Sequence, residues 1–290
     1  MVTSIIRKVR MRLYIFVYTI INLVCVPLIA ENNIEPKNYI ELVQLFEDWR
    51  DFENPPLMNG APDYTKRRFD RAQKEFNALQ NRLENVDTTN WPIYYQVDWW
   101  IVRAEMNGYD FNHRVLRPWV RDPAFYQTIW MYQSDVPAHE GPTNHGVLEF
   151  WMFDFPLNND RAKDLADQLK TIPNFLFQAK GNLTGNARDL WVAGIENFKE
   201  QADNLEAIRK KVKKHHGKSL DGLLSAPLKN AKEANDDFIK WLEQKAPTKN
   251  GPSGIGKENY TWYQKNVHLV PLSWEEEVSL LQRELDRSWS

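Results

Sequence analysis

Cysteine is almost absent from this chain. Its one cysteine, Cys25, lies in an uncharged apolar stretch near the N-terminus, and the preceding Val24 is too large for a lipid-attachment site. Residues 31–290 therefore have no thiol for a disulfide or for covalent catalysis, and we expect packing alone to stabilise them. The chain also lacks the Gly-x-Ser-x-Gly motif, which excludes a serine hydrolase built on that nucleophile turn.

A surplus of basic charge is missing as well. The formal net charge of −2 falls to −6 without residues 1–30, because that segment holds four basic residues and no acidic one. A negative domain repels nucleic-acid phosphates, so we expect no nucleic-acid partner. The basic run RKKVKKHHGK at residues 209–218 ends a long predicted helix, where cations complement the helix dipole and Gly217 can cap the helix.

Residues 1–30 differ in kind from the rest. Four basic residues precede the uncharged stretch LYIFVYTIINLVCVPLIA at residues 13–30, and the charged sequence ENNIEPKN follows it. This order is typical of a secretory signal peptide, although Leu28 is large for a site of cleavage after Ala30. The stretch is also nearly long enough to span a bilayer, so an uncleaved membrane anchor is one alternative and a buried helix another. The signal-peptide and anchor interpretations both place residues 31–290 outside the cytoplasm, in the periplasm or the extracellular space. If the anchor is not cleaved, the protein contacts the membrane only through residues 13–30.

Alternating strand patterns of convincing length and fixed-period repeats are both absent, whereas helical patterns are plentiful. Pro92, after the candidate cap Asn90, opens one helix, and Ser273 with Glu276 forms the capping box of the last. The sequence therefore predicts an all-α multi-helix array. The apolar stripes at steps of three and four run through Tyr39, Leu42, Phe46 and Trp49, through Phe69, Ala72, Phe76, Leu79, Leu83 and Val86, through Leu165 and Leu169, through Trp191, Ile195, Phe198, Ala202, Leu205 and Val212, through Leu220, Leu224, Leu228, Ala231, Phe238 and Trp241, and through Trp274, Val278, Leu281 and Leu285.

Residues 107–160 break this helical pattern. The segment holds five prolines and many aromatic side chains, among them Trp119, Phe125 and Trp130. Prolines at that density interrupt helices, while aromatic side chains favour burial. We expect a proline- and aromatic-rich irregular layer with short helices, either covering the core or lining a cleft.

The motif HEGPTNH at residues 139–145 has the letters of a metalloprotease site. A zinc-binding helix needs histidines four residues apart, so that both project from one face beside the catalytic Glu. His139 and His145 are six apart, which is about 200° around an ideal helix, and the prolines of the stretch disfavour a helix. A loop could still gather His139, Glu140 and His145 around a metal, but a hydrogen-bonded loop is the favoured interpretation. We assign no catalytic, cofactor-binding or metal-binding residue in this chain.

A second motif, GPSGIGKE at residues 251–258, matches a phosphate-binding loop only as far as Lys257. Glu258 stands where a Ser or Thr must hold magnesium, and the preceding segment predicts a helix and a turn rather than a strand. We expect no nucleotide site there.

Four segments resemble, in order, the N-terminal half of a bacterial family known as domain of unknown function 885. They are RDPAFY (residues 121–126), EGPTNHG (140–146), IPNFLFQAKGNLTGNARDLWVAGI (172–195) and the stretch at residues 255–288. The resemblance covers nearly all of residues 31–290. It implies a largely helical, exported, metal-dependent peptidase or hydrolase, whose hallmark H-E-G-x-P-G-H-x-x-Q lies in the second half of family members.

The resemblance also bears on residues 139–145. They share His139, Glu140, Gly141 and His145 with the hallmark, but Thr143 and Asn144 replace its Pro-Gly. They also precede the segments that resemble the half without catalytic residues. The resemblance thus implies that residues 31–290 are an N-terminal half cut before the hallmark, and that a divalent metal such as zinc belongs only to the missing half.

Two functions stay open on the sequence. The chain is either the N-terminal helical part of an exported metallohydrolase, forming one wall of a cleft for a peptide substrate, or a complete secreted or anchored helical module that binds or scaffolds without catalysis. The last predicted helix ends at Ser290 without a Gly cap, and the hallmark is absent, and both observations favour the first function. The oligomeric state is left open.

Purified residues 31–290 should contain no stoichiometric zinc, because the spacing in residues 139–145 does not suit a metal-binding helix. Elemental analysis by mass spectrometry, with Glu140→Ala and His145→Ala alongside, measures this directly. One zinc per chain that disappears in both variants would make the motif a metal site.

Overall fold

The computed structural model describes residues 35–133 and 145–289. The chain divides into two units, residues 1–41 and 42–290. The described part of the first unit, residues 35–41, ends within helix α2 (Tyr39–Glu53). The expected signal peptide or anchor at residues 1–30 lies outside the described residues, as do His139 and Glu140 of the HEGPTNH motif. No helix in the described part of the chain is long and apolar enough to cross a membrane.

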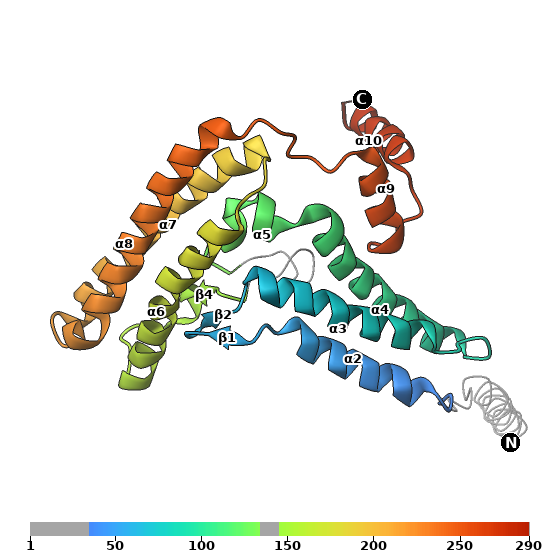
Figure 1. Cartoon of the computed structure of the whole chain (residues 1–290), viewed down its shortest axis with the longest axis horizontal. Coiled ribbons are helices and arrows are strands. Elements are labelled where there is room, and N and C mark those ends of the chain that lie inside the picture. Colours follow the sequence, from blue (N-terminus) through green and yellow to red (C-terminus); the bar gives the residue numbers. More distant parts are fainter. Residues whose placement is uncertain (1–34, 134–144, 290) are drawn as a thin grey trace, which may run out of the picture. The chain divides into compact units, whose positions relative to one another are not determined.

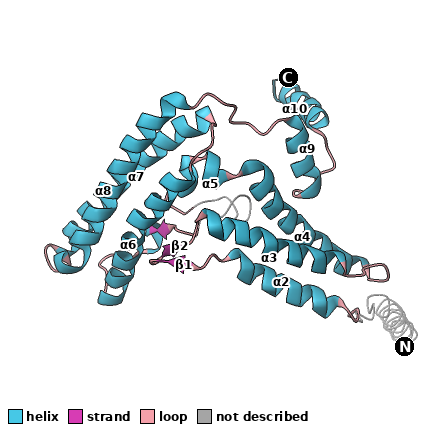
Figure 2. Ribbon diagram, viewed as in Figure 1, coloured by secondary structure: helices cyan, strands magenta, loops and turns pink. Residues whose placement is uncertain are grey.

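Helices dominate the second unit, as Figures 1 and 2 show, and the predicted all-α multi-helix array is confirmed. Helices α2, α3 and α4 lie side by side and form one group. In a second group, α8 packs against both α6 and α7. Helix α9 contacts α4 and α10. The bounds of the helices that follow α2 are α3 (Lys66–Glu84), α4 (Ile93–Phe111), α6 (Asn159–Asn182), α7 (Arg188–His216), α8 (Asp221–Lys245), α9 (Lys257–Asn266) and α10 (Trp274–Trp289).

The apolar stripe of α3 is buried as its spacing predicts. Ala72, Phe76, Leu79 and Leu83 are all buried along one face, and Thr65 caps the helix by accepting a hydrogen bond from the N–H of Arg68. Apolar residues at steps of three and four lie on one face of a helix. Packing of that face against a partner surface supplies most of the helix's stability.

One detail of the predicted α2 and one of the predicted α4 are wrong. In α2 the buried residue is Leu45 rather than Phe46, which stays half-buried beneath the guanidinium of Arg50, 4.6 Å from its ring centre. Asn90 does not cap α4, because the extended backbone of Pro92 delays the first helical residue to Ile93. The packing of Arg50 on Phe46 and the backbone conformation of Pro92 cause these differences, and neither can be deduced from the spacing of apolar residues.

The structure confirms the capping box predicted at the start of α10. The carboxylate of Glu276 accepts from the N–H of Ser273 at 2.7 Å, and the hydroxyl of Ser273 accepts from the N–H of Glu276 at 3.3 Å. The stripe that follows packs poorly, since Val278, Leu281 and Leu285 are all exposed in the described part of the chain.

The predicted irregular layer is confirmed in its described residues, 112–133 and 145–158, whereas residues 107–111 belong to α4 and residues 159–160 to α6. Its short elements are η1 (Asn112–Leu116), a π-helical turn, α5 (Pro118–Arg121), η2 (Pro123–Tyr126), β3 (Ile129–Trp130), β4 (Leu148–Glu149) and η3 (Phe150–Met152). Strands β3 and β4 pair in parallel. A second strand pair, β1 (Leu57–Met58) and β2 (Ala61–Pro62), turns at Asn59 and Gly60, whose positive φ angles of 52° and 82° suit a tight hairpin.

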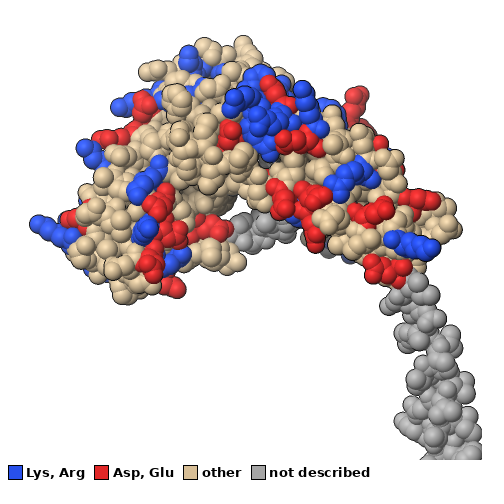
Figure 3. Space-filling view, turned by 60° about the horizontal axis from the view of Figure 1, so that its bottom comes forward, with Lys and Arg blue, Asp and Glu red and all other residues tan. Residues whose placement is uncertain are grey.

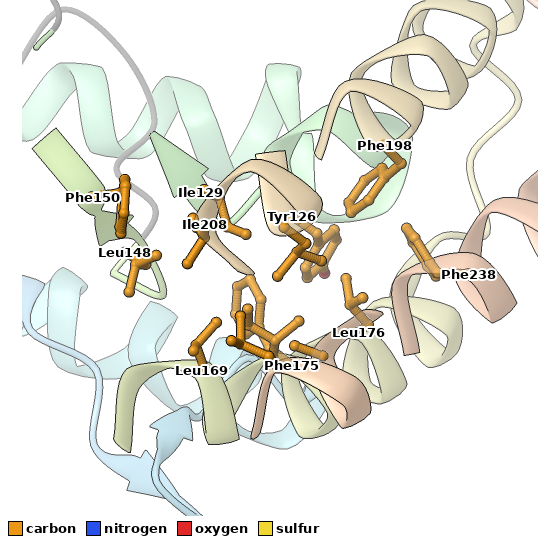
Figure 4. Close-up of a cluster of buried hydrophobic side chains, with 14 of the residues drawn as sticks. Tyr126, Ile129, Leu148, Phe150, Leu169, Phe175, Leu176, Phe198, Ile208 and Phe238 are labelled. Carbon is orange, nitrogen blue, oxygen red and sulfur yellow. The ribbon is translucent and has the colours of Figure 1, made fainter. Parts of the chain in front are cut away.

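The main core lies between this layer and helices α6, α7 and α8. Figure 4 shows its side chains pointing toward one another from all four sources, with Tyr126 and Ile129 of the layer meeting Phe175 of α6, Ile208 of α7 and Phe238 of α8. All five side chains are buried. The layer therefore completes the core, rather than lying loosely over it.

One buried amide joins the layer to two of the helices. The side chain of Gln201 on α7 is fully buried, and its Oε1 accepts from the backbone N–H groups of Thr128 at 2.7 Å and Ile129 at 3.2 Å. Its Nε2 donates to Oδ1 of Asn235 on α8 at 2.9 Å, and the amide of Asn235 donates to the carbonyl oxygen of Phe198 at 3.0 Å. Buried polar groups satisfied in this way fix one arrangement of the elements they join.

Replacement of this amide should be costly. Gln201→Ala leaves two buried N–H groups and one amide oxygen without partners, and we expect it to lower the free energy of unfolding by about 3–5 kcal/mol. Urea denaturation followed by circular dichroism measures the loss. Gln282→Ala, an exposed glutamine on α10, is the matched control and should change stability by less than about 0.5 kcal/mol. Equal stability of the two variants would contradict the structural role of Gln201.

Candidate functional site

A cavity of about 330 Å³ lies among α3, α4, η1, α5 and α9. Aromatic side chains form most of its wall, including Tyr64, Phe69, Tyr109, Trp119 and Phe125. Helix α9 closes one side because Trp262 stacks on Phe111 with ring centres 5.5 Å apart, and Asn107 donates to the carbonyl oxygen of Asn266 at 3.0 Å. The cavity thus forms where the helical groups and the irregular layer meet.

His113 stands at the centre of the aromatic wall. Its ring stacks on Tyr109, one helical turn earlier, with ring centres 3.9 Å apart, and tilts against Trp119 at 4.6 Å. Trp119 in turn stacks on Phe69 of α3 at 4.2 Å. The π-helical turn η1 and the positive φ of Arg117, at 44°, turn the chain so that His113 and Trp119 face each other.

The hydrogen bonding of His113 defines its tautomer. Nδ1 lies 2.9 Å from the carbonyl oxygen of Tyr109. A carbonyl oxygen can only accept, so Nδ1 carries the proton and Nε2 is left with a lone pair. Burial lowers the pKa of His113 to about 4, so the ring is neutral at pH 7.

Two acceptor atoms in the cavity wall are left without partners. Nε2 of His113 and Oδ1 of Asn112 are both buried and have no hydrogen-bond partner among the described residues. Buried polar atoms are nearly always paired, and an unpaired one costs about 1–3 kcal/mol.

Charged side chains surround the aromatic wall in pairs. Arg50 lies between Glu53, at 2.8 Å, and Glu105, at 2.6 Å, and Arg68 pairs with Glu75 at 2.7 Å. Three carboxylates and one guanidinium are among the lining residues, namely Glu53, Asp63, Glu105 and Arg68. Figure 3 shows acidic and basic side chains intermingled over the molecular face that it draws. Burial also raises the pKa of Tyr109, which therefore stays protonated at neutral pH.

The last residue of the HEGPTNH motif reaches this cavity. His145 lines the cavity, its backbone N–H donates to the hydroxyl oxygen of Tyr64 at 3.0 Å, and its Nδ1 lies 3.0 Å from the same oxygen. Desolvation lowers the pKa of His145. Because His139 and Glu140 lie outside the described residues, the interpretation of the motif as a loop stays a prediction. Within residues 35–133 and 145–289, no three His, Cys, Asp or Glu side chains are grouped to hold a metal.

The two other motifs have structural roles. In GPSGIGKE the guanidinium of Arg121 donates to the carbonyl oxygen of Ser253 at 2.9 Å, which fixes the loop before α9 begins at Lys257. After the basic run, Gly217 ends α7 with a φ of 56°, as predicted. The ring of His216 contributes a contact that the sequence did not indicate, since its Nε2 accepts from the N–H of Leu157 at 2.9 Å.

Sequence reasoning missed His113 entirely. The residue belongs to no motif, and nothing in FNHRVLRPW marks it as functional. The density of aromatic residues in 107–160 allowed either a cover over the core or a cleft, and it did not show which aromatic side chains would touch a ligand. The cavity requires Phe69 of α3 and Tyr263 of α9, which are distant in the sequence and come together only in the fold.

Comparison with known proteins finds no matching family model and no matching curated protein. Among solved structures the fold is similar to one described as "a putative lipoprotein of unknown function" from Shewanella oneidensis, with a TM-score of 0.56 and 15% sequence identity. The match covers 86% of this chain and 44% of the neighbour, so the chain spans less than half the neighbour's length. At that identity the likeness shows the fold alone.

His113 should make stability depend on pH. The unfolded pKa near 6.5 exceeds the folded value of about 4, so the unfolded chain binds the proton first and stability falls as pH drops between these values. Between pH 7 and pH 5 we expect His113 to contribute a loss of about 2 kcal/mol. Urea denaturation at both pH values should show a smaller loss for His113→Gln than for the wild type, while the exposed His215→Gln keeps the wild-type dependence. An identical pH dependence in His113→Gln would contradict the burial of a neutral ring.

Proposed function

We propose that residues 42–290 bind a small, largely apolar ligand in the aromatic cavity beside His113, as the substrate-binding part of an exported metal-dependent peptidase or hydrolase. The observation that carries the binding function is the cavity itself. Its volume of about 330 Å³ lies within the range of small-molecule sites, and a few polar atoms interrupt an aromatic wall. In a peptide substrate, one apolar or aromatic side chain is the part that fits.

The hydrolase setting rests on the resemblance to the N-terminal half of domain of unknown function 885. The Shewanella neighbour is more than twice as long as the part that matches, which leaves room in that protein for a second half. Its description as a lipoprotein is compatible with an exported or membrane-anchored chain here. In this proposal the chain binds substrate, and a metal in the other half supplies the activated water.

The competing proposal is a secreted or anchored binding module without catalysis. It uses the same cavity, so a binding experiment tests the feature common to both. Hydrolysis of peptides by the complete gene product, and its loss when the metal is removed, would separate them in favour of the hydrolase.

The binding function predicts that filling the cavity blocks a small aromatic probe. Ala104 is buried on α4 and lines the cavity, and Ala104→Phe should weaken the binding of indole at least about tenfold, because the added ring occupies the same volume. Ligand-observed NMR titration of residues 31–290 measures the affinity. Ala207→Phe is the matched control, since it makes the same change at an exposed position of α7 away from the cavity.

Three results decide the outcome. Binding by the wild type and the control, with loss in Ala104→Phe, supports the site. No binding by the wild-type protein contradicts the proposed function, and equal binding by all three proteins places the indole elsewhere. A thermal melt of each variant confirms that it is folded before the affinities are compared.

A further inference from the structure

We infer that the solvent-facing side of α4 is a membrane-contact surface, which lies on a zwitterionic lipid bilayer. We call this surface the α4 face and define it by Ile93, Val97, Trp100 and Ile101. The inference goes beyond the proposed function, because it concerns the surface of the protein and does not require a ligand in the cavity. It also adds a second contact to the sequence expectation, which places the membrane at residues 13–30 alone.

The first step is the set of apolar side chains that the fold leaves in water. The four side chains of the α4 face are exposed to 73%, 47%, 45% and 46% in chain order, while the opposite side of α4 buries Val102 and Met106. At 100° per residue the four lie within an arc of about 100° on the helix. Single exposed apolar residues are ordinary, but a contiguous apolar patch marks a surface that contacts a partner or a membrane.

The second step is the distribution of charge around the α4 face. Its four residues carry no charge. Arg103 stands at one edge, and its guanidinium lies over the indole of Trp100, 5.1 Å from the ring centre. The acids at the other edge are Asp98 and Glu105, and Glu105 is paired with Arg50 at 2.6 Å. A tryptophan beside an arginine at the border of an apolar face suits the headgroup level of a bilayer, because the ring meets the acyl chains while the cation reaches the phosphate.

The third step is the distance to a bilayer. Within the second unit α2 and α4 run in the same direction, so the start of α4 lies at the same end of this helical group as Leu42, where the unit begins (Figure 1). The eleven residues 31–41 separate Leu42 from the uncharged stretch at residues 13–30 and reach at most about 40 Å when fully extended. If that stretch anchors the chain, a bilayer is within reach of the α4 face.

The fourth step is the continuity of the α4 face with the aromatic cavity. Ile101 belongs to the face and also lines the cavity, as does Leu269, which is 44% exposed. The apolar surface therefore continues from Ile93 to the cavity wall. A bilayer on the α4 face gives this surface an apolar medium, and it brings the apolar interior of the membrane next to a cavity lined by aromatic side chains.

The first test places a fluorophore on the α4 face of the full chain. Val97→Cys, in a Cys25→Ala background that leaves no other thiol, is labelled with the environment-sensitive dye NBD and incorporated into phosphatidylcholine vesicles. The emission should shift to shorter wavelength and be quenched by lipids that carry a nitroxide on the acyl chain. The same label at Leu281→Cys, an exposed apolar position of α10, is the matched control and should keep the emission it has in water.

A second test uses residues 31–290, which are the mature chain if residues 1–30 are cleaved. In co-sedimentation with the same vesicles, Trp100→Glu should weaken partition at least about tenfold, because it places a carboxylate where the indole meets the bilayer. Trp289→Glu makes the same change at an exposed tryptophan of α10 and should partition as the wild type does. Addition of anionic phosphatidylglycerol should not strengthen binding, because these residues carry a net charge of −6.

The outcomes decide between a membrane and a protein partner. Loss of partition in Trp100→Glu, with an unchanged thermal melt, supports the inference. Water-like emission from the label at residue 97, no partition by the wild type, or equal partition by Trp100→Glu would overturn it. Light scattering that shows dimers abolished by Trp100→Glu would assign the α4 face to a second copy of the chain and also overturn it. No outcome depends on indole binding in the cavity, so the inference and the proposed function fail separately.

Discussion

The buried amide of Gln201 is the contact on which the arrangement of the irregular layer depends. It joins the backbone of Thr128 and Ile129 to the side chain of Asn235, so one residue connects the layer to α7 and α8. Residues 112–133 form only short helical turns and one two-residue strand, which leave part of their backbone groups without partners inside an element. Buried backbone groups without a ladder need side-chain partners, and Gln201 provides them in the core.

From that point, a chain of polar contacts leads to the cavity. The hydroxyl of Tyr126, two residues before Thr128, donates to the carbonyl oxygen of Trp119 at 3.0 Å. Asn182 of α6 donates to the same hydroxyl and to the carbonyl oxygen of Tyr64. Trp119 and Tyr64 both line the cavity. The packing of the core and the shape of the site are therefore coupled, which fits a site held on rigid elements rather than on a flexible loop.

The helical pattern was predictable where burial alone selects the residues. On α3 the spacing from Ala72 to Leu83 identified the buried face, and the capping box of α10 was found from two letters, Ser273 and Glu276. The prediction of the buried face failed where hydrogen bonds from other elements, rather than apolar spacing, decide which side chain is buried. On α7, Gln201 faces the protein core and Ala202 does not. The fold gives the amide of Gln201 a full set of hydrogen-bond partners, whereas a hydropathy pattern treats glutamine as a polar residue that stays exposed.

The sequence by itself determined an all-α fold, the positions of its long helices and the place of the irregular layer, because amphipathic spacing and proline density are local properties. Only the tertiary structure decided the site. His113 is an ordinary residue in the sequence, and it becomes a buried neutral imidazole because the carbonyl oxygen of Tyr109 and the rings of Trp119 and Phe69 surround it. Its environment combines two near neighbours in the chain, Tyr109 and Trp119, with the distant Phe69 of α3, whose ring centre lies 6.0 Å from the imidazole. No local pattern encodes that combination.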